Sequence, residues 1–485
     1  MILHIQHINH RINQIMHSAL AISCTLDDCV NVLENSGCLH ANVEYYTNTT
    51  KEKASQKAPG SNDSRTPVSS ESSESEDEDI VTYPEGGWTA WGVVLGSWLA
   101  LFGSMSFMNS LGAFQAYLLR NQLSDYSPEA VGWIFGVFNG LTFLLGIQAG
   151  PIFDARGPRE LILCGGALTV LYLMLLGICE RYWHFMLVFG LVGGLSLSLI
   201  FGPAIAIVAH YFDKKRGLAT GIASSGGAVG GIVFPLMLQH MFDTVGFAWA
   251  TRAASLVCVV TFVFASILMR PRFPRKQMTL KTIAPDITIL RHGGLMLTSM
   301  GVFFLEWGLF IPFTYLPSYA LDHGCSQQLS YLLLALINLG GIFGRWIPGF
   351  LADRFGRFNL LIITVLGSAL SMVCLWLPAR SSEALFIVFA LVFGFFSGAN
   401  VSLAPVCVSS LCKVYSVGRY YSTAYILVSI SMFTGTALGG KILEVSHNQY
   451  RNLIVFATVA YVASFVCLIW AKFVCAGRDK MWSKM

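Results

Sequence analysis

Long apolar segments dominate the chain from about residue 88 onward, and short polar stretches separate them. Each segment has about 20 residues or more, the length that an α-helix needs to cross the hydrocarbon layer of a membrane. The pattern predicts twelve membrane-spanning helices, six on each side of a basic loop from Arg270 to Arg291. The expected spans are 88–119, 128–150, 161–179, 183–210, 217–241, 246–269, 293–320, 328–352, 359–379, 384–412, 420–442 and 452–474.

The composition agrees with an all-α membrane protein. Of 485 residues, 54% are apolar and only 12% are charged, and the mean hydropathy is +0.60. A soluble chain would carry roughly a quarter charged residues. The net charge of +4 therefore gives no reason to expect nucleic-acid binding, and the lipid bilayer is the expected surrounding.

Lysine and arginine are distributed unevenly between the loops. If the first span begins in the cytosol, the even-numbered loops and the C-terminal tail carry nineteen of them, and the opposite loops and span edges carry six. Basic residues concentrate on the cytosolic side of membranes. We therefore expect a multi-pass protein, in the plasma membrane, with both termini in the cytosol.

Residues 1–86 differ in composition from the rest. The part from Asn48 to Asp79 is rich in Ser, Thr, Lys and Glu and ends in an acidic run, which is typical of disorder. Its serines are candidate phosphorylation sites, and a simple solvated tail is the alternative. Residues 1–40 contain no continuous apolar region of the kind a signal peptide requires. Four histidines there show no ordered metal-site pattern: His4, His7, His10 and His17.

These patterns predict five regions. They are a disordered cytosolic tail (1–86), a six-helix half (87–269), a cytosolic basic loop (270–292), a second six-helix half (293–475) and a cytosolic C-tail (476–485). The twelve cysteines have neither the spacing of a metal site nor that of a disulfide framework. No metal or other cofactor is expected.

The two halves carry a repeated motif. Residues 150–157 and 349–356 share the spacing Gly-x-x-x-Asp-x-x-Gly, 199 residues apart. A second resemblance joins 187–194 to 391–398, at the similar offset of 204. Because both offsets are close, the halves are expected to be colinear copies. Duplicated membrane bundles commonly form transporters whose binding site lies between the repeats.

Small residues line one face of four of the expected helices. The second span has glycines at steps of four (132, 136 and 140), and the fifth, eighth and eleventh spans show similar spacing. Such faces let helix backbones approach closely. Ordinary helix packing would explain any one of these faces. Their occurrence together in the second, fifth, eighth and eleventh spans indicates that these four helices share a role.

Two segments carry a family resemblance. Residues 83–91 (YPEGGWTAW) and 211–226 (YFDKKRGLATGIASSG) resemble the two signatures of the monocarboxylate porter family, within the major facilitator superfamily. The resemblance covers nearly everything after Tyr83, and residues 312–320 and 344–349 resemble fungal members. It implies the major facilitator fold of two six-helix halves. In that fold, helices 2 and 11, and helices 5 and 8, meet across the halves and slide as the bundle rocks.

Charged residues at the expected cytosolic ends of the spans are candidates for a gate. The two motif aspartates need partners there, and neighbouring arginines could form a latch that breaks when the inside opens; the alternative is loop stabilisation alone. The basic cluster at the start of the fifth span lies at the membrane edge, where it can bind anionic lipid. The candidate gating residues are Asp154, Arg156, Arg159, Asp353, Arg354, Arg357, Lys214, Lys215 and Arg216.

Ionisable groups deep in a bilayer are costly and usually functional, and two stand out. Glu306 lies in the seventh span and Arg345 in the eighth, where Arg345 shares a face with Asn338 and Gly341. A guanidinium there can bind a carboxylate through two hydrogen bonds. The family resemblance likewise implies that Arg345 binds the substrate anion. A static ion pair between Arg345 and Glu306 is the alternative.

The chain departs from proton-coupled relatives at two positions. They carry a lysine in helix 1 where this chain has Asn109, and an aspartate where it has Gly341. Glu306 could replace them as the proton carrier, because burial raises the pKa of a carboxyl group. Tyr315 is a further candidate for the cavity wall. Several aromatic residues could form a pocket for a larger or flatter substrate: Trp98, Phe303, Phe304, Phe310 and Phe313.

We therefore expect a secondary active or facilitative transporter of a small, monocarboxylate-like organic acid or a fungal metabolite, working by alternating access. The expected partners are this small molecule and, as a candidate for symport, a proton. The expected substrate-binding residues are Arg345, Asn109, Asn338, Glu306 and Tyr315. A nutrient-sensing receptor on a transporter scaffold, without flux, is the alternative. No arrangement typical of an enzyme is present, whether Ser-His-Asp, metal or phosphate loop.

Overall fold

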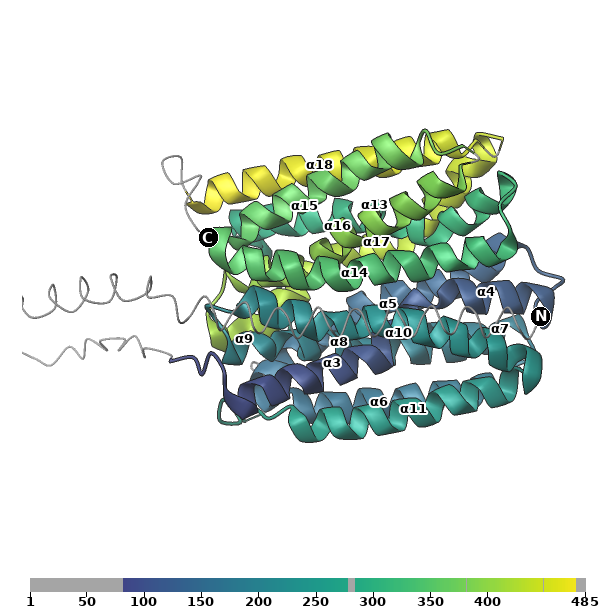
Figure 1. Cartoon of the computed structure of the whole chain (residues 1–485). Coiled ribbons are helices and arrows are strands. Elements are labelled where there is room, and N and C mark those ends of the chain that lie inside the picture. Colours follow the sequence, from purple (N-terminus) through teal and green to yellow (C-terminus); the bar gives the residue numbers. More distant parts are fainter. Residues whose placement is uncertain (1–81, 278–283, 381, 448, 477–485) are drawn as a thin grey trace, which may run out of the picture. The chain divides into compact units, whose positions relative to one another are not determined.

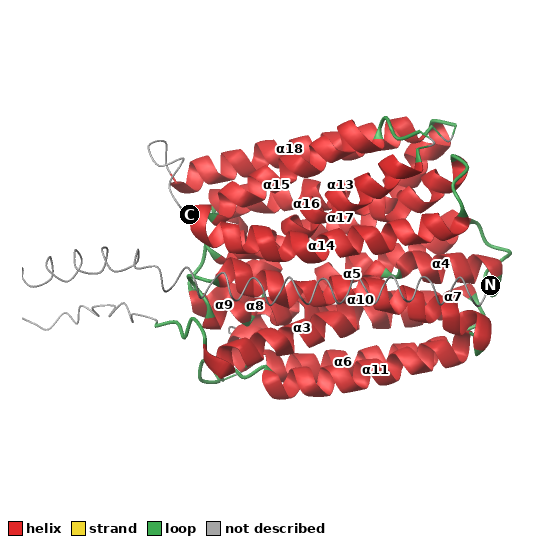
Figure 2. Cartoon of the chain, viewed as in Figure 1, coloured by secondary structure: helices red, strands yellow, loops and turns green. Residues whose placement is uncertain are grey.

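The computed structural model describes residues 82–277, 284–380, 382–447 and 449–476. The predictions for the N-terminal tail up to residue 81, including disorder, phosphorylation and the four histidines, lie outside the described residues. Within the described ranges all regular secondary structure is helical (Figure 2). Twelve helical segments there are long and apolar enough to cross a membrane. The prediction of an all-α membrane protein with twelve spans is thus confirmed.

The first half runs from α3 to α11 (Figure 1). Its fourth span is a continuous helical segment, Tyr182–Tyr211, made of four short elements. The elements are α3 (Gly87–Asn109), α4 (Leu111–Arg120), α5 (Pro128–Arg156), α6 (Pro158–Leu176), α7 (Tyr182–Phe185), η3 (Met186–Gly193), α8 (Gly194–Ala206), α9 (Val208–Tyr211), α10 (Arg216–Thr244) and α11 (Phe247–Leu268).

The second half runs from η4 to α18. Its helices are η4 (Ile287–Arg291), α13 (Gly293–Asp322), α14 (Gln327–Phe355), α15 (Arg357–Ser371), η5 (Met372–Trp376), α16 (Glu383–Ser409), η6 (Val414–Ser416), α17 (Val417–Val445) and α18 (Tyr450–Ala476). The second, fifth, eighth and eleventh spans of the sequence analysis are therefore α5, α10, α14 and α17.

The expected first span, 88–119, is divided into two helices. The backbone leaves helical geometry at Ser110, between α3 and α4. The Ser110 hydroxyl donates to the carbonyl of Ser106 at 2.6 Å, one of the local side-chain bonds by which serine bends helices. The spanning part of this segment is α3, Gly87–Asn109.

The motif helices α5 and α14 begin and end in the same way. At the start, the hydroxyl of Ser127 accepts the N–H of Ala130, and the hydroxyl of Ser326 accepts the N–H of Leu329, both at 3.2 Å. At the end, Gly157 and Gly356 take φ values of +84° and +98°, which only glycine adopts readily. The last glycine of the repeated motif is therefore the residue that stops each helix.

The two halves meet along the glycine-lined helices. Helix α5 packs along α17, and α10 packs along α14, as the family resemblance implies. A Cβ at Gly150 would collide with the carbonyl of Gly418, and a Cβ at Gly349 would lie 2.6 Å from the carbonyl of Gly217. The first glycine of each motif thus permits backbone-to-backbone contact between the halves.

Candidate functional site

A pocket lies between the two halves; we call it the central pocket. Helices α3, α5 and α8 line it from the first half, and α13, α14, α16 and α17 from the second. It contains the side chains of Glu306 and Arg345, which are 7% and 6% exposed. Of the aromatic residues expected to form a pocket, Phe310 and Phe313 line the central pocket as well.

The Arg345 guanidinium is buried without full pairing. Its Nε and Nη1 atoms have no hydrogen-bond partner among the described residues. None of the ion pairs within the described ranges joins Arg345 to Glu306. The structure therefore does not contain the static ion pair between Arg345 and Glu306 that the sequence left as an alternative. A buried charge without a partner costs several kcal/mol, so this site is suited to an anion that arrives from outside the chain.

Two asparagines on the pocket wall hold helices together. Asn109 of α3 donates to the carbonyl of Gly227 of α10 at 3.0 Å. Asn338 of α14 donates to the carbonyl of Gly231 of α10 at 3.5 Å and to that of Leu334 in its own helix at 3.0 Å. Both side chains flank Gly231 of α10, where a Cβ would lie 2.8 Å from an atom of each. The side chains line the central pocket, but their amide N–H groups already have partners in the chain.

Tyr315 lies elsewhere. It is not among the residues that line the central pocket. Its ring instead packs against Gly439 of α17, where a Cβ would lie 2.8 Å from the ring. Of the expected substrate-binding residues, the structure therefore brings together Arg345, Asn109, Asn338 and Glu306 and leaves Tyr315 apart from them.

The two motif aspartates cap helices of the opposite half; we call this part of the bundle the aspartate end. Asp154 accepts the N–H groups of Gly418 and Arg419, both at 2.9 Å, at the start of α17. Asp353 accepts those of Gly217 and Leu218, at 2.8 and 3.0 Å, at the start of α10. The two contacts are copies of each other.

The sequence analysis expected basic side chains to bind these aspartates. The hydrogen bonds come from backbone N–H groups in the first turn of a helix instead. The first N–H groups of a helix have no partner within it, and the positive end of the helix dipole favours an anion there. A carboxylate four residues after a glycine lies on the same helical face. In each Gly-x-x-x-Asp motif, the glycine therefore lets the backbones of two helices approach closely, and the aspartate caps a helix of the opposite half.

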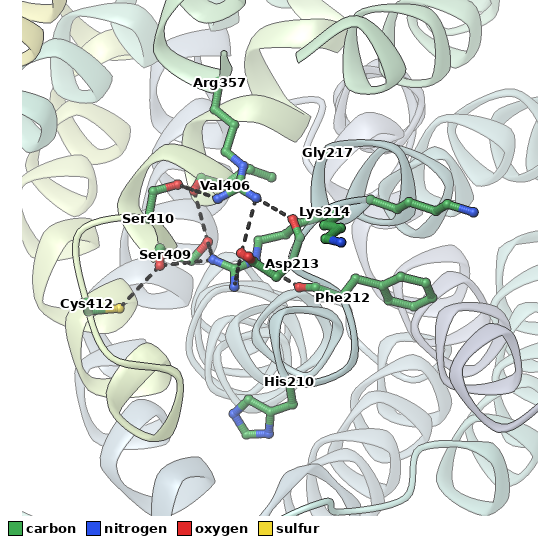
Figure 3. A network of polar contacts seen from close by, with 12 residues as sticks. His210, Phe212, Asp213, Lys214, Gly217, Arg357, Val406, Ser409, Ser410 and Cys412 are labelled. Atoms are coloured by element: carbon green, nitrogen blue, oxygen red, sulfur yellow. Dashed lines mark hydrogen bonds and ion pairs between the residues drawn. The ribbon is translucent and has the colours of Figure 1, made fainter. Parts of the chain in front are cut away.

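A polar network around Asp213 also joins the halves (Figure 3). Asp213 forms ion pairs with Arg216 at 3.2 Å and with Arg357 at 3.3 Å. Arg216 donates to the carbonyl of Ser409 at 3.1 Å, and Arg357 donates to the Ser410 hydroxyl at 3.1 Å. The loop before α10 is thereby bound to the end of α16 and the start of α15.

Two of the remaining gating candidates contact residues of their own half. Arg156 pairs with Glu160 at 3.3 Å, and the Arg354 guanidinium lies 4.4 Å from the ring centroid of Phe350. The side chains of three others are exposed: Arg159, Lys214 and Lys215.

Glu85 was missed by the sequence analysis. Its carboxylate accepts the backbone N–H groups of Asp213 at 2.9 Å, Lys214 at 2.7 Å and Lys215 at 3.2 Å. Glu85 belongs to the first signature segment, and the loop that it binds belongs to the second. The two signatures are therefore parts of one contact. An acidic residue before Gly86-Gly87 was a possible signal, but backbone donors leave no mark in a sequence.

Twelve spans in two matched halves, with a charged pocket between them, define a membrane transport protein. The chain belongs to the Major Facilitator Superfamily, whose family model matches residues 93–436 and 347–481. It is an integral, multi-pass membrane transporter, and proteins of this family bind small-molecule substrates.

Fungal transporters are similar along most of the chain. The riboflavin transporter MCH5 of Saccharomyces cerevisiae is 34% identical, over 84% of this chain and 82% of that protein. The MFS-type transporter opdF of Penicillium oxalicum is 35% identical, over 79% and 89%. The fujikurins efflux protein of Gibberella fujikuroi is 35% identical, over 81% and 83%.

Solved structures show the same fold. The human organic anion transporter MFSD10 matches with a TM-score of 0.62 at 16% identity, over 78% of this chain and 98% of that one. The fucose:proton symporter FucP of E. coli matches with a TM-score of 0.59 at 14% identity, over 79% and 98%.

Proposed function

We propose that this protein transports an organic anion across the membrane by alternating access, and that Arg345 binds the anion's carboxylate in the central pocket. The observation that supports this most is the buried guanidinium with two unpartnered nitrogens. A guanidinium presents its N–H groups in the planar arrangement that a carboxylate accepts. An arriving carboxylate would provide the partner that the chain does not.

The substrate we propose is a monocarboxylate-like acid or a carboxylate-bearing fungal metabolite. The resemblance to the monocarboxylate porters supports an acid. The metabolite is supported by the relatives, which include a riboflavin transporter and a fujikurins efflux protein. Phe310, Phe313 and Met105 give the pocket an apolar wall, which suits an anion with a larger apolar body.

Glu306 is our candidate for proton coupling, and facilitated transport without a proton is the alternative. Its carboxyl group is buried in the central pocket and has no ion-pair partner among the described residues. Such a group is costly to keep charged, so protonation can accompany a change in its surroundings. Proton-coupled relatives carry charged residues at the positions of Asn109 and Gly341. In this chain Glu306 would therefore carry the proton without the help of those charges.

The aspartate end is our candidate for the cytosolic gate of a plasma-membrane protein. The charge distribution in the loops supports this orientation. Contacts between the halves support it as well, because Asp154, Asp353, Arg216 and Arg357 each contact the other half at this end. Opening it to the cytosol would require all these contacts to break together.

Counterflow in proteoliposomes tests the proposal. Wild-type protein, Arg345→Ala and Arg345→Lys are loaded with unlabelled acid and assayed with labelled monocarboxylates and larger carboxylates. We expect Arg345→Ala to lose at least tenfold in apparent affinity, and Arg345→Lys to lose less because it keeps the charge. Wild-type rates in Arg345→Ala would overturn the assignment. Binding without any flux would favour the receptor alternative.

A further inference from the structure

A second pocket lies between α5, α8 and α17, on the aspartate side of the central pocket. Its wall includes Gly150, Phe153, Gly202 and Gly418. Gly418 is also the residue whose N–H is bound by Asp154 at 2.9 Å. The second pocket therefore ends at one of the two aspartate contacts.

Three aromatic rings are shared by the walls of the second pocket and the central pocket. Phe143 of α5, Phe201 of α8 and Tyr425 of α17 line both pockets. The ring centroids of Phe143 and Phe201 are 5.4 Å apart, and those of Phe143 and Tyr425 are 5.6 Å apart. The three rings thus form one contiguous cluster where the two pockets meet. Two of them come from the first half and one from the second, so a relative movement of the halves would open it.

The second pocket contains one buried hydroxyl that donates to no carbonyl among the described residues. The hydroxyls of Thr142, Ser198 and Ser422 all donate to carbonyls of their own helices, at 2.7 to 3.1 Å. The hydroxyl of Tyr421 is different: it is buried and donates to no carbonyl among the described residues, and its polar neighbour is the Tyr425 hydroxyl one turn along α17. Leaving a buried hydroxyl unpartnered costs about 1–3 kcal/mol, so a visiting acceptor would be favoured there.

We propose that Phe143, Phe201 and Tyr425 form an aromatic gate and that the second pocket is a transit site for the transported anion, whose carboxylate accepts a hydrogen bond from Tyr421. This inference rests on the proposed function. It places the route to the aspartate end along α5, α8 and α17. The anion leaves Arg345, passes the separated rings and pauses at Tyr421 before the Asp154 contact opens.

The size of the residue at position 143 tests the gate. Uptake of labelled acetate, benzoate and 2-naphthoate is compared in wild type, Phe143→Ala and Phe143→Trp. We expect the naphthoate-to-acetate rate ratio to rise at least threefold in Phe143→Ala and to fall in Phe143→Trp. Phe135→Ala is the matched control, because Phe135 lies on the same helix, is 5% exposed against 6% for Phe143, and lines neither pocket.

The naphthoate-to-acetate ratio does not depend on the amount of folded protein. If Phe143→Ala does not fold, Phe143→Trp still tests the gate because it keeps an aromatic ring at this position. An unchanged ratio across the series, with wild type transporting all three acids, would overturn the gate and leave the proposed function intact. If wild type transports none of them, both proposals are wrong.

The transit site is tested by removing one oxygen atom. Tyr421→Phe keeps the ring and removes the hydroxyl. We expect its turnover to fall several-fold while the equilibrium Kd for benzoate, measured on purified protein, stays within twofold of wild type. Tyr172→Phe is the control, since Tyr172 is 2% exposed against 4% for Tyr421 but lines neither pocket. Unchanged turnover in Tyr421→Phe, or an equal loss in Tyr172→Phe, would overturn the transit site.

Discussion

A Cβ at Gly341 would lie 3.7 Å from Nη1 of Arg345, one turn along the same helix. The guanidinium therefore leans back over a position that has no side chain. In the monocarboxylate porters that the sequence resembles, an aspartate stands there. This chain lacks the carboxylate at the very position from which one could neutralise Arg345.

We expect Gly341→Asp to make anion transport depend on acid. A Cβ at position 341 meets only ordinary contacts, 3.5 Å or more from its neighbours, so the position has room for the first side-chain atom. Near neutral pH the new carboxylate would pair with Arg345 and lower the apparent affinity for benzoate about tenfold or more. At lower pH its protonation would release Arg345 and restore transport. Counterflow at a series of pH values measures this.

Gly341→Asn is the matched control, because it has the same size without the charge. It should change affinity much less and add no acid dependence. The same loss in both variants would mean that steric crowding, rather than charge, controls the site.

We expect Glu306→Gln to abolish any dependence of transport on a proton gradient. The amide has the size of the protonated acid but cannot release a proton, so the variant should keep exchange and lose accumulation driven by an inward proton gradient. Uptake with and without such a gradient is the measurement. Gradient-driven accumulation that survives in Glu306→Gln would exclude Glu306 as the carrier.

We expect Asp154→Asn and Asp353→Asn to loosen different helix starts. Hydrogen bonds to a charged group contribute about 1.5–3 kcal/mol, so their weakening should speed local amide exchange roughly tenfold or more. Hydrogen exchange with mass spectrometry should show this at Gly418 and Arg419 for Asp154→Asn. For Asp353→Asn it should appear at Gly217 and Leu218.

Each of these variants is the control for the other. Equal loosening of both helix starts in either variant would show that the two contacts open as one unit.

We expect Gly150→Ala to impair the closed aspartate end, because its Cβ would collide with the backbone of Gly418. Overpacking typically costs about 1–3 kcal/mol, and thermal unfolding in detergent should occur at a lower temperature. Gly132→Ala on the same helix is the control, since a Cβ there meets nothing within 4 Å. A similar fall in unfolding temperature in both variants would mean that alanine within α5, rather than the contact with Gly418, causes the loss of stability.

Glu85→Gln is expected to free the loop before α10. The amide side chain retains one acceptor but loses the negative charge that binds three N–H groups, so amide exchange at residues 213–215 should rise. Glu129→Gln is the control, because Glu129 is exposed at the start of α5. Unchanged exchange in Glu85→Gln would show that the loop holds its shape without the carboxylate.

Regular features of the fold could be predicted from the sequence because they repeat. The length of the apolar segments gave the spans, and glycine spacing marked the helices that meet across the halves. Arg345 and Glu306 could be found because a charge is rare in such segments. The partners of Asp154, Asp353 and Glu85 could not be predicted, since every residue except proline has a backbone N–H and only the folded chain shows which ones are free.

The reciprocal capping has a consequence for the origin of the chain. Asp154 of the first half binds the start of α17, and Asp353 of the second half binds the start of α10. Two identical six-helix subunits could make the same pair of contacts with each other, as a symmetric dimer does when one surface patch meets its own copy. The arrangement is what fusion of such a dimer into one polypeptide would leave behind. Once the two copies were joined in one chain, only the second half needed to acquire the buried arginine, Arg345.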